Sequence, residues 1–184
     1  MRHFTDDQIT AQVRAVLADR PEDKVLCFAC NWCSYAGGDM AGISRMQYPA
    51  SNRVVRTMCS ARVSEEMMVE AFRRGAPVVL VSGCHYADCH YINANRQTVK
   101  RVHKVWDKLE KAGVRPERLQ LEWISAAEGQ KFAKVMRQME ELRKTVTRQE
   151  IEHAMEALKP KPKKAAKAKA KEAKEDTPAP PPPP

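Results

Sequence analysis

Short apolar runs alternate with longer amphipathic segments through most of this 184-residue chain. The runs are rich in β-branched residues, which is typical of strands buried on both faces of a parallel sheet. The segments between them carry apolar residues three or four positions apart, the spacing of a helix with one buried face. We expect four strands, at residues 24–29, 53–58, 77–82 and 119–124.

Several of the amphipathic segments begin with a residue that can cap a helix. Three of them have capping-box spacing, in which Glu or Gln follows Ser or Thr by three positions: Thr5 with Gln8, Ser125 with Glu128, and Thr147 with Glu150. We therefore predict helices at residues 4–18, 64–74 and 94–112, and two more that start after Ser125 and Thr147. Strand followed by helix, repeated, predicts an α/β fold: a doubly wound, mainly parallel sheet of about four strands with flanking helices.

Two stretches depart from this alternation. Residues 31–52 are irregular and glycine-rich, and only part of them is expected to form a short helix. From Lys159 the chain is mostly Lys, Ala, Pro and acidic residues and ends in five prolines, a composition that cannot form a packed core. We divide the chain into an N-terminal helical extension (1–23), an α/β domain (24–146), a C-terminal helix (147–158) and a disordered tail (159–184).

Charge and composition narrow the class of protein. The net charge is +9, but residues 159–184 contribute +5 of it, so the high isoelectric point is weak evidence for a nucleic-acid partner, and none is expected. The first residues lack the apolar segment of a secretory signal, and no stretch approaches the ~20 apolar residues of a membrane span. We expect a cytoplasmic protein without a membrane partner. Its six cysteines are then metal ligands or redox groups rather than disulfides.

Five of the cysteines follow the ends of predicted strands. Cys30 and Cys33 form a C-x2-C pair after the first strand, Cys59 follows the second, and Cys84 and Cys89 form a C-x4-C pair after the third. Because parallel strands bring their carboxyl ends to one edge of a sheet, we expect these five thiols to lie close together. Four soft sulfur ligands suit zinc or an iron–sulfur centre, and spacing alone does not favour either.

Other interpretations of these residues remain open. Cys30 and Cys33 also have the spacing of a thioredoxin-like dithiol, and Cys84, Cys89 and His90 that of a variant haem-attachment motif. His85 and His90 are candidate ligands, although histidines in such positions more often donate hydrogen bonds to a site or lie at an interface. Strand alternation puts Cys27 on the face opposite Leu26 and Phe28, where it is expected to be a buried apolar residue.

Several spaced motifs around these cysteines resemble one known family. They are Cys30-Asn31-Trp32-Cys33-Ser34-Tyr35-Ala36-Gly37, Arg56-Thr57-Met58-Cys59-Ser60, and Gly83-Cys84-His85 with Asp88-Cys89-His90-Tyr91. Together with Leu121-Glu122-Trp123-Ile124-Ser125-Ala126, they closely resemble the delta (iron–sulfur) subunit of methyl-viologen-reducing hydrogenase. The resemblance covers roughly residues 24–143, and the small departures at Gly38 and Ala61 remove no cysteine.

The resemblance implies a small electron-transfer protein with one [2Fe-2S] cluster. The spacing of the cysteines also allows zinc, which is the alternative metal. It also implies two partners: an electron-donating module, such as a hydrogenase or a formate dehydrogenase, and the flavin-containing subunit of a heterodisulfide-reductase-like complex. The candidate ligands are Cys30, Cys33, Cys59, Cys84 and Cys89. The two pairs are the first choice, and Cys59 could replace one member.

The chain is expected to act as one part of an oxidoreductase complex and not as an enzyme by itself. It has no glycine-rich nucleotide fingerprint, no P-loop and no nucleophile–base arrangement beyond the cysteines. The competing activity is thiol–disulfide exchange through Cys30 and Cys33. Aromatic residues and histidines beside the cysteines are expected to line the surface that a partner contacts: Trp32, Tyr35, His85, Tyr86 and His90.

Overall fold

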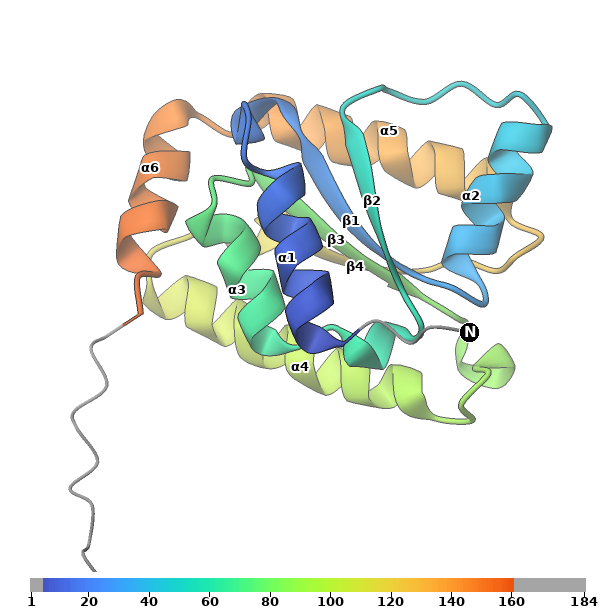
Figure 1. The fold of residues 1–184 in the computed structure, drawn as a ribbon. Coiled ribbons are helices and arrows are strands. Elements are labelled where there is room, and N and C mark those ends of the chain that lie inside the picture. The colour runs from blue at the N-terminus through green and yellow to red at the C-terminus, as the bar shows by residue number, and fades with distance from the viewer. Residues whose placement is uncertain (1–4, 161–184) are drawn as a thin grey trace, which may run out of the picture.

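The computed structural model describes residues 5–160 and contains one four-stranded parallel sheet. Its strands are β1 (Val25–Cys30), β2 (Asn52–Thr57), β3 (Val78–Gly83) and β4 (Leu119–Trp123), in the spatial order β2-β1-β3-β4 (Figure 1). The predicted α/β fold and the four predicted strands are confirmed, with bounds shifted by one residue at most of the ends. The two central strands, β1 and β3, are buried along their whole length.

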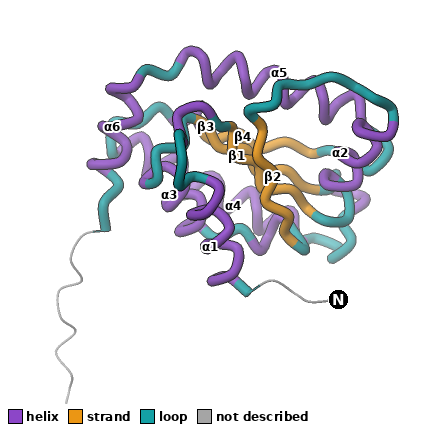
Figure 2. The backbone as a smooth tube through the Cα atoms, turned by 45° about the horizontal axis from the view of Figure 1, so that its top comes forward, coloured by secondary structure: helices purple, strands orange, loops and turns teal. Residues whose placement is uncertain are grey.

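Helices cover both faces of the sheet (Figures 1 and 2). One face packs against α1 (Asp6–Val16), α3 (Glu65–Arg73) and α4 (Ala94–Lys111), and α6 (Arg148–Ala157) packs on α3 in the same layer. The other face packs against α2 (Ser34–Ile43) and α5 (Gly129–Thr145). Strand alternation divides the apolar residues between the two layers, so that Leu26 and Phe28 face the first and Cys27 the second.

Local sequence explains where most helices begin and end. The Thr5–Gln8 and Thr147–Glu150 capping boxes are both formed, and the Ser64 hydroxyl caps α3. Gly75 and Gly113, which follow α3 and α4, have φ angles of +86° and +69°, a conformation that glycine adopts without a steric cost. The predicted helix at residue 4 begins outside the described residues, and most of the predicted tail, residues 161–184, also lies outside them.

The short helix expected within residues 31–52 is present as α2, whose glycines pack closely on neighbours: a Cβ on Gly38 would lie 3.0 Å from the Phe132 ring. One expectation needs correction. The predicted capping box at Ser125 is wrong, because α5 begins only at Gly129. The Glu128 carboxylate does accept the backbone N–H of Ser125, but within a turn that precedes the helix.

The strand order makes the connections after β1 and β3 leave the sheet toward opposite faces. The connection from β1 runs through α2 on one face, and the connections from β2 and β3 run through α3 and α4 on the other. Chain segments therefore diverge at the carboxyl ends of β1 and β3, which is where doubly wound sheets form their ligand crevice. The cysteine-bearing loops meet at this edge.

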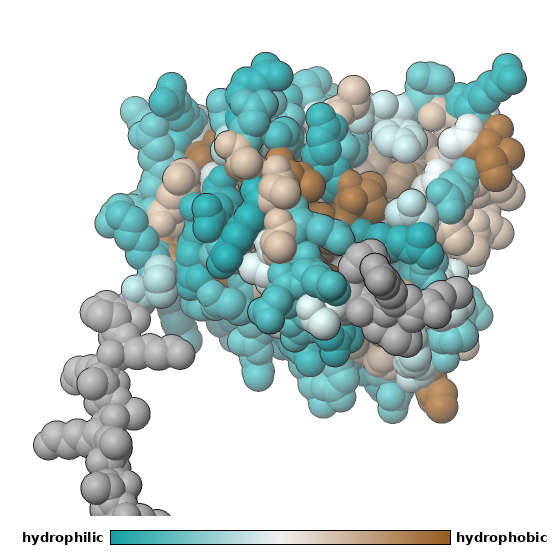
Figure 3. All heavy atoms as spheres, in the orientation of Figure 1, coloured by the Kyte–Doolittle hydropathy of each residue, from teal (hydrophilic) through white to brown (hydrophobic). Residues whose placement is uncertain are grey.

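The face shown in Figure 3 is largely hydrophilic, with separate apolar groups. Among residues 5–160, no helix combines the length and the apolar character that crossing a membrane requires.

Candidate metal centre

The structure brings the predicted cysteines together at the edge where β1 and β3 end. Cys30 is the last residue of β1, and Cys84 directly follows β3, its hydrogen-bonded neighbour. Cys33 immediately precedes α2, Cys59 follows β2, and Cys89 lies in the loop before α4. Three different strand ends thus supply the five thiols.

Cys30, Cys33 and Cys84 pack together in one group, and Cys59 adjoins this group through Cys30. The Cys30 and Cys84 sulfurs are 3.6 Å apart, Cys59 hydrogen-bonds with Cys30, and Cys33 hydrogen-bonds with Cys84. These four are buried, whereas Cys89 is partly exposed and packs against the group from outside. All five are free thiols.

Backbone N–H groups point at three of the sulfurs. Cys30 accepts from the amides of Trp32 and Cys33, and Cys84 accepts from the amide of His90. The Ala61 amide donates to the Cys59 sulfur over 3.4 Å. Such donors stabilise the anionic form of a sulfur, and hydrogen bonds to sulfur are one of the means by which proteins tune iron–sulfur centres.

The thiols in this group affect each other's ionisation. Hydrogen bonds from Cys59 and Cys84 lower the pKa of Cys30, so that its thiolate is favoured. The same hydrogen bonds raise the pKa of Cys59 and of Cys84. One negative charge therefore opposes a second in the same group, and a cation is needed to hold several thiolates there together.

The residues fit a thiolate-bound metal in chemistry and in part in spacing. Two sulfurs on one tetrahedral ion, each about 2.3 Å from it, lie about 3.8 Å apart, close to the Cys30–Cys84 distance of 3.6 Å. Within residues 5–160, however, no three His, Cys, Asp or Glu side chains form a ready-made site for a metal ion. The thiols pack on each other, so binding requires some of the side chains to rotate.

Cys27 belongs to a different environment. It lies on β1 among the apolar residues that face α2 and α5, and its sulfur is 3.7 Å from the Ser82 hydroxyl. Burial raises its pKa to about 12, so it stays a neutral thiol. The expectation that Cys27 packs as an apolar residue is confirmed.

The two candidate histidines have other contacts. The His85 Nε2 atom is 2.7 Å from a Glu128 carboxylate oxygen, which links the Cys84–Cys89 loop to the turn before α5. The His90 ring stacks on Trp32 with a centroid distance of 3.9 Å. The Trp32 indole N–H in turn donates to the Tyr91 hydroxyl over 3.4 Å. These side chains support the cysteine loops from outside.

The arginines that flank Cys59 in sequence have partners other than its thiol. Arg56 donates to the Asn31 side chain and lies over the Tyr35 ring, and Arg62 forms an ion pair with Asp6. The donors nearest the sulfurs are therefore backbone amides and not arginine side chains.

Several residues that support the site were not identified from the sequence. Asn95, which is buried in the first turn of α4, donates its side-chain amide to the carbonyls of Cys84 and His85, at 3.2 and 3.1 Å. Ser60 hydrogen-bonds with Thr98 beneath the site. Gly83 gives Ser60 room, since a Cβ there would lie 2.7 Å from its hydroxyl oxygen. Close packing of this kind has no signature in a single sequence.

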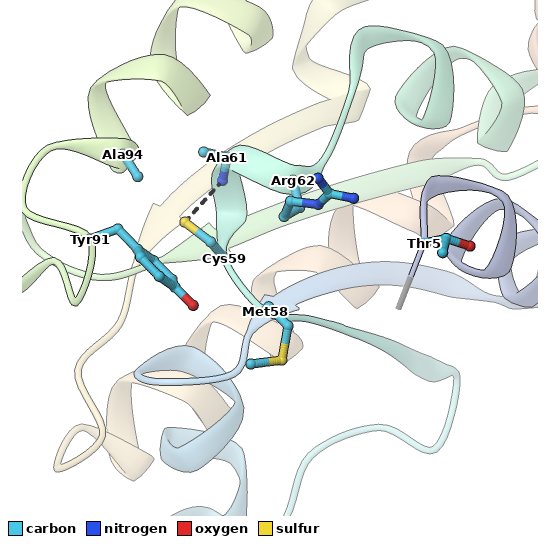
Figure 4. A pocket seen from close by; sticks show the side chains of 7 residues that line it. All are labelled: Thr5, Met58, Cys59, Ala61, Arg62, Tyr91 and Ala94. Atoms are coloured by element: carbon cyan, nitrogen blue, oxygen red, sulfur yellow. Dashed lines mark hydrogen bonds between the residues drawn. The ribbon is translucent and has the colours of Figure 1, made fainter. Parts of the chain in front are cut away.

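A pocket of about 470 Å³ borders the site on the side of Cys59 (Figure 4). Tyr91 lines it from the loop before α4, and Met58 and Arg62 line it from the segment around Cys59. Cys59 therefore connects the buried thiols with a hollow that is open to solvent.

Comparison with known proteins adds a family to this geometry. Residues 25–146 match the family described as methyl-viologen-reducing hydrogenase, delta subunit. The vhc iron-sulfur subunit of an F420-non-reducing hydrogenase from Methanococcus voltae is 47% identical over 116 residues, which are 63% of this chain and 81% of that protein. The iron-sulfur subunit of the F420-non-reducing hydrogenase from Archaeoglobus profundus is also 47% identical, over 65% of this chain and 88% of its own length.

A third relative is much longer. A ferredoxin:CoB-CoM heterodisulfide reductase subunit from Methanosarcina mazei is 48% identical over 134 residues, which are 72% of this chain but only 17% of that protein. The chain thus spans a small part of one kind of relative and most of the other. On the match over residues 25–146, this chain belongs to the family of methyl-viologen-reducing hydrogenase delta subunits.

Proposed function

We propose that this protein is an electron-transfer subunit that carries a [2Fe-2S] cluster on its cysteine edge. The observation that supports this most directly is the contact among four buried thiols at the ends of three strands, with backbone amides aimed at the sulfurs. A related protein in Methanococcus voltae is named an iron-sulfur subunit of a hydrogenase. Such a cluster, when bound, would accept and donate one electron at a time.

The chain's own residues supply the ligands and their surroundings. The C-x2-C and C-x4-C pairs, Cys30 with Cys33 and Cys84 with Cys89, are the first choice of ligands, and Cys59 is the candidate to replace one of them. The amides of Trp32, Cys33 and His90 would stabilise the negative charge on the ligand sulfurs. Burial of Cys30 and Cys84 would exclude water, while the partly exposed Cys89 would leave one side near the surface.

The two kinds of relative support a proposal for the partners. In Methanosarcina mazei, a segment like this chain is covalently part of a heterodisulfide reductase polypeptide. In Archaeoglobus profundus, it is a separate hydrogenase subunit. We therefore propose that this chain relays electrons between a hydrogenase, formate dehydrogenase or similar donor module and the flavin-containing subunit of a heterodisulfide-reductase-like complex.

The cofactor is tested by metal analysis of anaerobically purified protein. We expect about two iron atoms and two acid-labile sulfides per chain and an EPR signal after reduction, as for a [2Fe-2S] centre. A colourless protein with one zinc ion per chain would contradict the proposal. Cys59→Ser and Cys89→Ser, compared by iron content and EPR line shape, identify which of the two completes the ligand set.

An insulin-reduction assay distinguishes an electron-transfer subunit from a thiol–disulfide enzyme. If the protein were a thiol–disulfide enzyme acting through Cys30 and Cys33, it would reduce insulin, and Cys30→Ser would abolish that activity while Cys84→Ser would retain it. For an electron-transfer subunit we expect negligible insulin reduction, and loss of iron in both variants.

A further inference from the structure

The loop between β3 and α4 exposes apolar side chains beside the candidate metal centre. Eight large apolar residues are exposed within residues 5–160, and three of them, Tyr86, Tyr91 and Ile92, lie in this one loop. Ile92 is the most exposed of the eight, at 85%. Tyr91 and Ile92 are adjacent in the chain, and large apolar side chains exposed together at a surface mark a site of interaction.

Ile92 also has an unusual backbone conformation. Its φ angle is +66°, in the left-handed region, where a β-branched side chain crowds its own backbone. Arg20 and Arg45 are the other non-glycine residues between 5 and 160 with positive φ, and neither is β-branched. Asn or Gly would fit this position with less strain. A strained residue whose side chain points into solvent suggests a functional role.

The loop that presents Ile92 is held in place by its neighbours. The Ile92 amide donates to the Cys89 carbonyl over 2.8 Å, and the Asn93 amide donates to the Tyr91 carbonyl over 2.7 Å. Trp32, from the loop after β1, stacks on His90 and hydrogen-bonds with Tyr91. The exposed isoleucine is therefore preorganised, which lowers the entropic cost of binding through it.

The position of Ile92 suits contact with an electron-transfer partner. It is three residues from Cys89, the most exposed of the five candidate ligands. The next residue, Asn93, borders a hollow of about 590 Å³ whose lining includes two cations, Arg96 and Lys100. Arg96 lies over the Tyr86 ring, and neither cation forms an ion pair within residues 5–160. The hollow is lined by Tyr86, Asn93, Arg96, Gln97, Val99 and Lys100.

We propose that Ile92 is the apolar anchor through which this chain docks on the flavin-containing subunit of a heterodisulfide-reductase-like complex. The complementary surface is an apolar socket bordered by carboxylates that face Arg96 and Lys100. This inference depends on the proposed function for the identity of the partner. It is supported by the Methanosarcina mazei relative, in which a segment like this chain is joined to the rest of a heterodisulfide reductase polypeptide and must lie near it.

The test measures the affinity of the full-length protein for the heterodisulfide-reductase-like flavoprotein of the organism that encodes it. Ile92→Asn removes the apolar side chain and places a residue that tolerates positive φ, so the melting temperature should stay the same or rise. We expect its Kd to increase at least tenfold, with iron content and EPR spectrum unchanged. Ile43→Asn is the matched control, because Ile43 is 80% exposed at the end of α2, and its Kd should stay within twofold of wild type. Lys100→Glu should also weaken binding.

Each other result contradicts a specific part of the proposal. Equal affinity of Ile92→Asn and wild type, no binding by wild type, or a lower melting temperature with loss of iron would overturn the docking role of Ile92. Unchanged binding by Lys100→Glu would overturn the carboxylate-bordered socket. A wild type that contains zinc but binds through Ile92 would refute the proposed cofactor and leave the docking site in place. If wild type contains the cluster and the Ile92→Asn variant binds as tightly as wild type, the proposed cofactor stands and the docking site is refuted.

Discussion

Two cysteines of β1, three positions apart, show how far local environment determines the chemistry of a side chain. Cys27 lies among apolar residues, where burial raises its pKa to about 12. Cys30 lies at the strand end, where thiols and backbone amides donate hydrogen bonds to its sulfur and lower its pKa. The first is suited to packing, and the second to binding a metal as a thiolate.

This contrast predicts different outcomes for two alanine substitutions. Cys27→Ala removes a buried sulfur and should cost about 1 kcal/mol of unfolding free energy, with the metal content unchanged. Cys30→Ala should lose the bound metal altogether. Metal analysis and denaturant unfolding of both variants check this, and loss of metal from Cys27→Ala at normal stability would make Cys27 a ligand.

Asn95 is the second residue for which the structure predicts a measurable effect. Its side-chain amide donates to two successive carbonyls in the Cys84–Cys89 loop, and Asn95→Ala leaves both without that donor. We expect a loss of about 1–3 kcal/mol of unfolding free energy and a changed EPR line shape. Asn93→Ala is the control, since Asn93 is exposed and its side chain makes no capping hydrogen bond. Equal effects of the two variants would contradict the positioning role of Asn95.

The cysteines could be identified from the sequence, but the polar residues that position their loops could not. The spacing of Cys30, Cys33, Cys84 and Cys89, and the position of Cys59 after a strand, are visible in the chain itself. Asn95 and Thr98 are different, because a polar residue in an amphipathic helix normally suggests exposure to solvent. Their burial depends on loops that are distant in sequence and meet only in the folded protein.

At the scale of elements, hydrophobic period and capping residues predicted every strand and most of the helix starts. The exception at Ser125 has a physical reason, since the Glu128 N–H donates to the Ser125 carbonyl and not to its hydroxyl. This hydrogen bond closes a turn, and α5 begins at Gly129. The short helix α2 was expected within residues 31–52, but its bounds were not, because its glycines have low helix propensity and are there for close tertiary packing.

One carboxylate fastens the connection between α2 and β2 to helix α5. Glu140 accepts hydrogen bonds from Arg143 and from the Ser51 hydroxyl, which lower its pKa from the ordinary value of 4.5. A carboxyl group with a lowered pKa in the folded state stabilises the fold above its unfolded pKa, and this contribution is lost as the pH falls through the folded pKa.

Glu140→Gln should therefore be less stable than wild type at pH 7, by about 1–3 kcal/mol, and the difference should shrink as the pH falls below 4.5. Glu141→Gln is the control, because within residues 5–160 Glu141 forms only an exposed ion pair with Lys144. Urea unfolding at several pH values measures both. A difference from wild type that stays constant with pH would show that the charge of Glu140 does not contribute.

At the scale of the whole molecule, the core extends beyond the part that matches the family. That match covers residues 25–146, yet α1 packs on the same face of the sheet as α3 and α4, and α6 packs on α3. Helix α6 and the residue after it bury Ile151, Ala154 and Leu158. This segment also provides backbone carbonyls for two arginines: buried Arg118 donates to Glu150, and Arg73 donates to Leu158.

Truncation of the chain before α6 and truncation after it should therefore have very different effects on stability. A chain that ends at Val146 loses the burial of two large apolar side chains, worth about 1.5–3 kcal/mol each, and leaves Arg118 without one of its acceptors. At about 2–4 °C per kcal/mol, the melting temperature should fall by on the order of 10 °C. A chain that ends at Pro160 retains all these contacts and should melt within about 2 °C of the full chain. Calorimetry of the three chains decides the matter: equal melting of the chain that ends at Val146 and the full chain would mean that α6 rests on the core without stabilising it, and that residues 1–146 fold without it.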